Sequence, residues 1–230
     1  MAGEMEKFIK GISNCLGRDT VPEAPTPLHI PHTVHDDVMQ GADEDELAKT
    51  FIKNAELSGT TVYECDLADL NKTLIKAVTD FGDGPVVCAD HDFFSEHNCF
   101  EELQDHFKQV KKWDLSLSSA RNIANSEQAL VGIAKAELAL AESGTVVLFS
   151  HFGSGRSISL LPTDTVTVIC RQDLRPRLTQ AMSFLRDRDG SGLPSSVNFI
   201  SGASSTADIE LVRVQGVHGP MATSCILVSQ

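Results

Sequence analysis

The fold is decided by residues 43–90, DEDELAKTFIKNAELSGTTVYECDLADLNKTLIKAVTDFGDGPVVCAD. Acidic residues at its start, apolar residues at helical spacing and a closing glycine predict a helix over residues 43–59. The β-branched run at 60–65 predicts a strand, the apolar spacing over 70–82 a second helix, and the apolar run at 85–89 a short buried strand. This alternation of strand and helix is typical of a parallel sheet that helices cover on both faces.

The rest of the chain adds a β-rich portion to this pattern. Two apolar runs flank Glu142-Ser143-Gly144 and predict a β-hairpin with its tip at the glycine. The expected elements after residue 90 are helices over 95–110 and 174–185, and strands at 112–117, 136–141, 145–150, 158–161, 165–170, 197–200 and 222–228. We therefore expect a three-layer α/β/α protein with a mostly parallel sheet plus an antiparallel portion.

The first 42 residues are expected to form a helix and a proline-rich connector, ahead of a single α/β domain over residues 43–230. Phe8, Ile9, Ile12 and Leu16 fit one face of a short helix and lack the continuous apolar run of a signal peptide. Four prolines between residues 22 and 31 preclude a regular helix in the connector. No apolar run approaches the ~18 residues of a membrane span.

Charge is unevenly distributed along the chain. Residues 1–115 hold 10 Lys and Arg against 23 Asp and Glu, whereas residues 116–230 hold nine of each. Nucleic acids and anionic membranes require clustered cations, so neither is expected as a partner. The six cysteines form no C-x-x-C pair, which argues against a zinc or iron–sulfur site within this chain. We interpret them as reduced thiols of a cytoplasmic protein.

Residues 201–220, SGASSTADIELVRVQGVHGP, concentrate groups capable of chemistry. They follow a predicted strand, and ligands of open α/β sheets bind at the carboxyl ends of strands. Small side chains expose backbone N–H groups to an anion such as a phosphate or carboxylate. The candidate ligand-binding residues of this loop are Ser201, Gly202, Ser204, Ser205 and Thr206. Capping of a short helical turn by Ser205 or Thr206 is the alternative interpretation.

Three further residues of this segment are candidates for a site. His218 is a candidate general acid or base, because the pKa of histidine lies near working pH. Asp208 is the second catalytic candidate, and Glu210, two positions on, would share a face with it on an extended chain. A solvated acidic edge and a structural histidine in a tight turn are the competing interpretations.

Glu142, Thr145 and Arg156 complete the candidate ligand-binding set. Glu142 and Thr145 flank the predicted hairpin tip, where a turn glycine alone also explains the sequence. Arg156 ends His151-Phe152-Gly153-Ser154-Gly155-Arg156, a loop that imitates a dinucleotide fingerprint but is followed by β-like residues where a helix is required. We reject the fingerprint and keep Arg156 as an anion ligand, with an exposed surface arginine as the alternative.

Two histidine-rich groups receive no site assignment. His29, His32 and His35 imitate a metal cluster, but the neighbouring prolines deny them helical geometry. The second group is spread over a predicted helix and its approach and consists of His91, Asp92, His97, Cys99 and His106. The sequence contains no G-x-S-x-G, P-loop or H-E-x-x-H motif. No metal ligand is therefore predicted.

Three segments together resemble one family. AESGTVVL at 141–148, SISLLP at 157–162 and the segment 201–220 are similar, in order and spacing, to the LUD-domain family of the lactate utilisation protein C type. The similarity is strong over residues 120–230. The family pattern usually has proline where this chain has Ala203.

The resemblance implies both a fold and a function. The implied fold is that of the sugar-phosphate isomerase and CoA-transferase group. The implied function is that of an accessory subunit in the oxidation of L-lactate to pyruvate, without a cofactor of its own, beside partner subunits that carry iron–sulfur clusters. The alternative is a stand-alone enzyme or binder of a small anionic metabolite, such as a CoA ester or phosphosugar.

Overall fold

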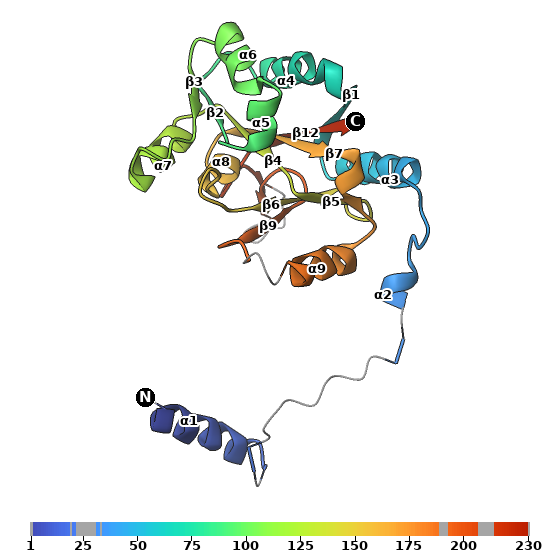
Figure 1. The fold of residues 1–230 in the computed structure, drawn as a ribbon, viewed down its shortest axis with the longest axis vertical. Coiled ribbons are helices and arrows are strands. Elements are labelled where there is room, and N and C mark those ends of the chain that lie inside the picture. The colour runs from blue at the N-terminus through green and yellow to red at the C-terminus, as the bar shows by residue number, and fades with distance from the viewer. Residues whose placement is uncertain are drawn as a thin grey trace. The chain divides into compact units, whose positions relative to one another are not determined.

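The computed structural model describes residues 2–18, 20–21, 31–32, 34–188, 193–206 and 214–229, and the chain divides into two compact units, residues 1–35 and 36–230 (Figure 1). In the first unit, α1 (Ala2–Cys15) is the predicted amphipathic helix. Its apolar side chains are exposed, including Phe8, Ile9 and Ile12. The predicted boundary after residue 42 stays a prediction. No helix among the described residues is long and apolar enough to cross a membrane.

The second unit is built on a six-stranded, wholly parallel sheet. In spatial order its strands are β1 (Thr60–Asp66), β12 (Ala222–Ser229), β7 (Asp164–Cys170), β4 (Val131–Lys135), β2 (Val86–Cys88) and β3 (Val110–Lys112). Every residue of β7 is buried. A strand buried on both faces requires a near-continuous apolar or β-branched run, which DTVTVIC supplies after its first residue.

A smaller four-stranded sheet carries the antiparallel portion. Its order is β8 (Leu174–Arg175), β5 (Leu138–Leu140), β6 (Thr145–Phe149) and β9 (Val197–Ile200), with β5–β6 and β6–β9 antiparallel. Alternate residues of β6 enter two different cores: Val146 and Leu148 the main one, Val147 and Phe149 a second one with Leu185. Because successive side chains of a strand point to opposite faces, this sheet separates two apolar layers.

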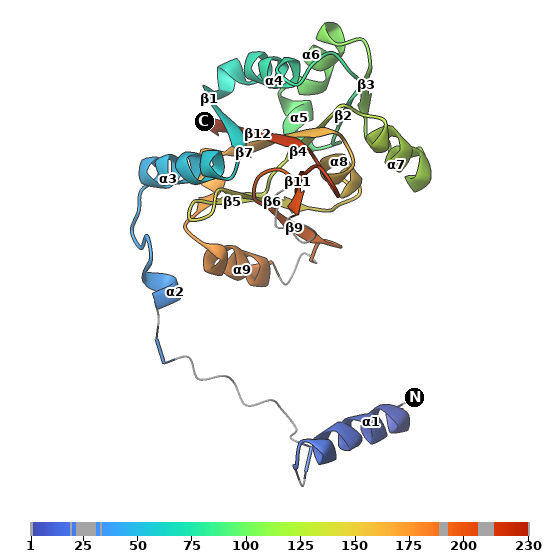
Figure 2. The ribbon, with the colours of Figure 1, turned by 180° about the vertical axis from the view of Figure 1, so that it is seen from behind.

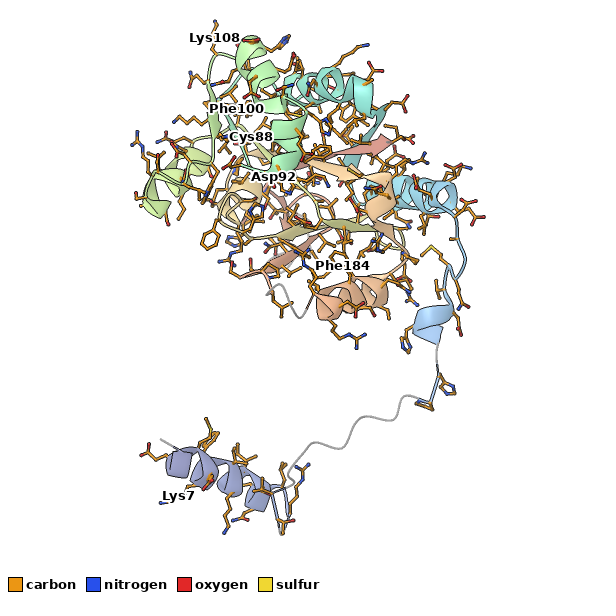
Figure 3. The ribbon with its side chains drawn as sticks, in the orientation of Figure 1. Lys7, Cys88, Asp92, Phe100, Lys108 and Phe184 are labelled. Atoms are coloured by element: carbon orange, nitrogen blue, oxygen red, sulfur yellow. The ribbon has the colours of Figure 1, made fainter. Side chains whose placement is uncertain are left out.

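Helices flank both sheets. They are α3 (Glu44–Leu57), α4 (Leu70–Thr79), α5 (Asp92–Glu96), α6 (Cys99–His106), α7 (Ser119–Glu127), α8 (Ser157–Leu160) and α9 (Leu178–Asp187), with single turns at Leu67–Asp69 and Arg171–Asp173. The short helix α2 (Val34–Asp37) spans the boundary between the two units. Figures 1 and 2 show α4 and α6 on one side of the large sheet, and the small sheet with α9 on the other. Figure 3 places Phe184 on α9, facing the small sheet.

Most of the predicted elements are confirmed, including an α/β protein whose main sheet is parallel and the hairpin of β5 and β6. Three predictions are wrong. The strand expected at 158–161 is absent from the described residues, because residues 158–160 belong to helix α8 and Leu161 caps it. The helix expected over 95–110 is two helices, because Asn98 adopts a left-handed φ of 52° between α5 and α6. The strand expected at 112–117 lies at Val110–Lys112 instead.

Candidate functional site

The structure brings two of the predicted ligand-binding residues together. The Thr145 hydroxyl lies 2.5 Å from the Ser201 hydroxyl and 2.6 Å from that of Ser143. Gly202 adopts a φ of 73° and backs onto the Ser58 carbonyl, so a side chain at this position would collide with the end of α3. These contacts join the hairpin tip to the loop after β9 and give each hydroxyl a partner inside the protein.

The rest of the predicted loop is fastened mainly by its own backbone. Ser204 donates from its N–H to the Pro220 carbonyl at 2.9 Å and accepts from the Gly216 N–H at 2.8 Å. Ser205–Thr206 forms β10, which pairs antiparallel with β11 (Val214–Gln215). His218 is exposed in the turn that follows. Asp208 and Glu210 lie outside the described residues, so their predicted roles stay predictions, as do those of the serines.

Two other candidates lie away from this loop. Glu142 accepts a 2.7 Å hydrogen bond from Nε of Arg177, and Asn54 of α3 donates to the Glu142 carbonyl at 2.9 Å. Arg156 is exposed directly before α8. The residues after this loop form helix α8, so the expectation of β structure there is wrong. The ligand-binding roles of Glu142 and Arg156 stay predictions.

The strand order of the large sheet points to a different place. The chain leaves β2 toward β3 on one side and leaves β4 toward β7 on the other, and β2 and β4 are neighbours. Such a reversal is a topological switch point, where open α/β sheets bind ligands outside the carboxyl ends of the strands. Asp90, His91 and Asp92 follow β2, and Glu137 follows β4. The sequence therefore places polar side chains at this point.

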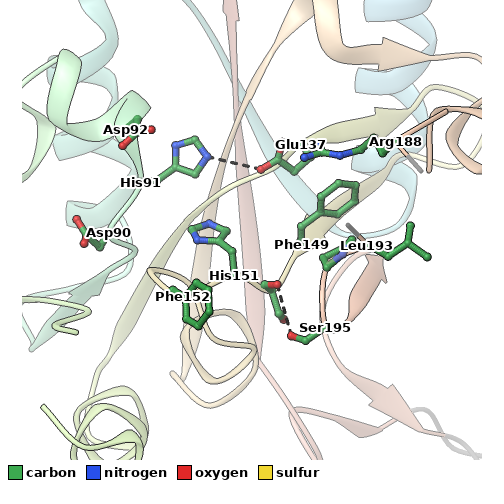
Figure 4. Close-up of a pocket in the computed structure, with 12 residues that line it drawn as sticks. Asp90, His91, Asp92, Glu137, Phe149, His151, Phe152, Arg188, Leu193 and Ser195 are labelled. Carbon is green, nitrogen blue, oxygen red and sulfur yellow. Dashed lines mark hydrogen bonds and ion pairs between the residues drawn. The ribbon is translucent and has the colours of Figure 1, made fainter. Parts of the chain in front are cut away.

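A cleft of about 720 Å³ opens there (Figure 4). We call it the switch-point cleft. Besides the four residues after β2 and β4, it is lined by the end of β6 with the loop that follows, by Arg188 after α9, and by residues 193–195. Its volume lies within the range of small-molecule binding sites.

His91 and Glu137 lie beside each other across the two strand ends (Figure 4). His91 Nε2 lies 3.6 Å from Glu137 Oε1, and His91 Nδ1 accepts a 3.1 Å hydrogen bond from the Phe93 N–H. Interaction with His91 holds the pKa of Glu137 below its usual range, and Lys135 and Arg188 add to this effect. Glu137 is therefore an ionised acceptor at the wall of the cleft.

His151 presents a hydrogen-bond donor. Its Nδ1 accepts from the Gly153 N–H at 3.2 Å, so the neutral ring carries its proton on Nε2. Burial lowers the pKa of His151, and the nearby His91 lowers it further. Within the described ranges, His151 Nε2 makes no hydrogen bond to another protein group. The ring is consequently a neutral donor available to a ligand.

The same hydrogen bonds bear on metal binding. A metal-ligating histidine nitrogen has no proton, and the other nitrogen then carries the proton and donates it. In both His91 and His151 the Nδ1 atom accepts from a backbone N–H instead. Among the residues that the structure describes, no group of three or more His, Cys, Asp or Glu side chains is placed to hold a metal ion.

Arg188 supplies positive charge to the cleft. Its guanidinium carbon lies 5.4 Å from the Phe149 ring centroid and 5.6 Å from that of Phe184. A guanidinium is attracted to aromatic faces at such distances, so the two rings help to position Arg188. On the opposite wall, Lys112 pairs with Asp90 at 3.1 Å, which offsets that carboxylate.

The loops that carry the two histidines are tied to each other. The Asp90 N–H donates to the Gly153 carbonyl at 2.8 Å, and Gly153 backs so closely onto the Asp90 carbonyl that a side chain there would collide. The rings of His91 and His151 meet edge to face with centroids 5.6 Å apart. Sequence reasoning assigned no site to His91 and Asp92. The feature of the sequence that indicates them is the polar triplet Asp90-His91-Asp92 directly after a buried strand.

Known proteins resemble this chain in sequence and in fold. A DUF162 family protein from Deinococcus radiodurans shares the fold, with a TM-score of 0.60 and 18% identity over 81% of this chain and 98% of that one. Proteins named "Lactate utilization protein C" are 36% identical in Geobacillus sp. strain WCH70 and 35% identical in Bacillus subtilis strain 168. Each match covers 97% of this chain and 95% of the relative. The model of the LUD domain family matches residues 48–228, and the chain belongs to that family.

Proposed function

We propose that this protein acts in lactate utilisation, as a cytoplasmic accessory subunit in the oxidation of L-lactate to pyruvate beside iron–sulfur partner subunits. The observation that carries the proposal is the similarity to proteins named "Lactate utilization protein C" over nearly the whole chain. The fold is proposed to be the three-layer α/β/α fold of the sugar-phosphate isomerase and CoA-transferase group.

The cysteines support the placement of the clusters in partner subunits. Cys88, Cys99, Cys170 and Cys225 are buried in the fold. An iron–sulfur cluster is held by several cysteine thiolates, and among the described residues no group of three or more His, Cys, Asp or Glu side chains is placed to hold a metal ion. The chain's own role is then to bind and orient, while electrons pass through the partners.

Purification from the native cell tests this proposal. We expect the tagged chain, recovered from cells grown on L-lactate, to bring iron-containing partners and lactate-oxidising activity with it, and the tag alone to bring neither. The chain purified by itself is expected to oxidise no L-lactate with an artificial electron acceptor. Oxidation by the isolated chain, or recovery without any iron-containing partner, would contradict the proposal.

The second candidate is a stand-alone enzyme or binder of a small anionic metabolite, and the switch-point cleft favours it. Arg188 and the His151 donor lie in a cleft large enough for a CoA ester or phosphosugar fragment. A ligand present at 100 times its Kd adds about 2.7 kcal/mol to stability, which a thermal shift detects. A shift with such an ester or phosphosugar, and none with L-lactate, favours this second function.

A further inference from the structure

The switch-point cleft carries an inference about the substrate that this chain holds. We propose that it binds a 2-hydroxy carboxylate of lactate size, whose hydroxyl lies between Glu137 and His151 and whose carboxylate lies toward Arg188. The choice of ligand rests on the proposed function. The placement of the ligand rests on the geometry of the cleft.

A hydroxyl group both donates and accepts, and the cleft offers one partner of each kind. The Glu137 carboxylate is ionised and can only accept. His151 Nε2 carries a proton and, in its neutral ring, can only donate. His91 holds Glu137 from the side at 3.6 Å, and its ring lies 5.6 Å from that of His151. The two ligand partners thus extend from neighbouring loops into one cleft (Figure 4).

This arrangement predicts discrimination between lactate and pyruvate. The hydroxyl of lactate donates to Glu137 and accepts from His151, whereas the ketone of pyruvate can only accept. The carbonyl oxygen of pyruvate would therefore face the ionised Glu137 carboxylate with no hydrogen bond between them. Sites built to hydrogen-bond a substrate hydroxyl reject analogues that leave the site's polar group unpaired.

The cleft is lined by the carboxylates of Asp90, Asp92 and Glu137, and two of the three lie beside basic side chains. Asp90 is paired with Lys112, and Glu137 lies beside His91 with Arg188 close enough to lower its pKa. The Arg188 guanidinium stands against Phe149 in the cleft wall, and an arginine in that position is suited to a carboxylate. The cleft also exceeds the size of one three-carbon acid. Phe152, which also lines the cleft, is 88% exposed.

Calorimetric titration of the purified full-length chain tests the inference. We expect saturable binding of L-lactate, with pyruvate and propionate at least about tenfold weaker, because each loses one or both hydroxyl hydrogen bonds. Glu137→Gln is expected to weaken L-lactate binding by about tenfold or more and to remove the preference over pyruvate. His151→Gln is expected to weaken the binding of both L-lactate and pyruvate. The matched controls Glu127→Gln and His106→Gln change exposed residues outside the cleft and should bind as the wild type.

A second measurement needs no variant. On titration with L-lactate, the ring-proton NMR signals of His91 and His151 should shift together in the wild-type chain, whereas that of His106 should not. Absence of saturable L-lactate binding, or binding that both cleft variants retain in full, overturns the inference. If iron-containing partners still co-purify in that case, the proposed function stands. If the chain binds L-lactate but brings no such partner, the proposed function fails instead.

Discussion

Gly144 shows how a single residue couples the hairpin to a helix. It adopts a φ of 60°, and a Cβ added there would run into the backbone nitrogen of Ala55 in α3. Gly144→Ala is therefore expected to cost about 2–4 kcal/mol of unfolding free energy, measured by urea denaturation. Gly59→Ala is the control. Gly59 has a φ of 85° with no atom within 4 Å of the added Cβ, so it should lose only about 1 kcal/mol. Equal losses would contradict the packing argument.

His151 predicts how stability responds to acid. Its pKa is lowered in the folded state, and the groups facing it are His91, Glu137, Asp90 and Asp92. As pH falls below the unfolded value of about 6.5, the unfolded chain takes up this proton first, so stability falls until the pH passes the folded pKa. His151→Gln should lose less stability than the wild type between pH 7 and pH 5, by chemical denaturation at each pH. His106→Gln should follow the wild type; an unchanged slope in His151→Gln would refute the assignment.

The sequence assigns neither histidine of the cleft to a site. His91 belongs to a polar group spread over a predicted helix and its approach, and His151 belongs to the loop whose dinucleotide fingerprint is rejected. They meet because β2 and β4 are neighbours in the large sheet and because the Asp90 N–H binds the Gly153 carbonyl. Both facts depend on the order of strands far apart along the chain. Periodicity within a single segment does not contain that order.

At the scale of one element, α3 shows what local patterns predict well. The acidic first turn and the glycine after the helix predict its two ends from the sequence, and in the structure Asp43 forms a capping box with Glu46. Asp43 Oδ1 accepts from the Glu46 N–H at 2.8 Å, and Glu46 Oε2 accepts from the Asp43 N–H at 3.3 Å. Asp43→Ala should therefore cost about 1 kcal/mol of unfolding free energy, by urea denaturation. Asp43→Asn keeps the capping oxygen and should cost only a few tenths; losses of the same size in both variants would show that the cap is not the cause.

Helix α8 shows where local patterns fail. Ser157–Leu160 has a β-like composition, and its helical turn is set by tertiary contacts. Gly132 of β4 backs onto the Ile158 carbonyl, and Thr165 donates to the Ser159 carbonyl at 3.2 Å. Ile158 is fully buried in the main core. A four-residue segment does not form a stable helix by itself, so its conformation depends on these contacts. Composition alone therefore predicts this segment wrongly.

The whole chain raises the question of where the folded domain begins. Among the described residues, those that form both apolar cores belong to the second unit. The earliest are Met39 and Ala42, packed against the main core ahead of Leu47 and Phe51 in α3. A chain that begins at residue 36 keeps every one of them. The domain boundary predicted from the sequence, after residue 42, would remove Met39 and Ala42.

Three truncations distinguish these boundaries. A chain that starts at residue 36 should unfold in urea at the same midpoint as the full-length protein, because no core residue is lost. A start at residue 43 exposes the apolar surface that Met39 and Ala42 cover, and should lower the unfolding free energy by about 1–2 kcal/mol. A start at residue 60 removes α3, with the fully buried Phe51, and should not fold cooperatively. Equal stability of the chains starting at 36 and 43 would place the boundary where the sequence predicted it. A clear loss in the chain starting at 36 would show that the first 35 residues contribute to the stability of the domain.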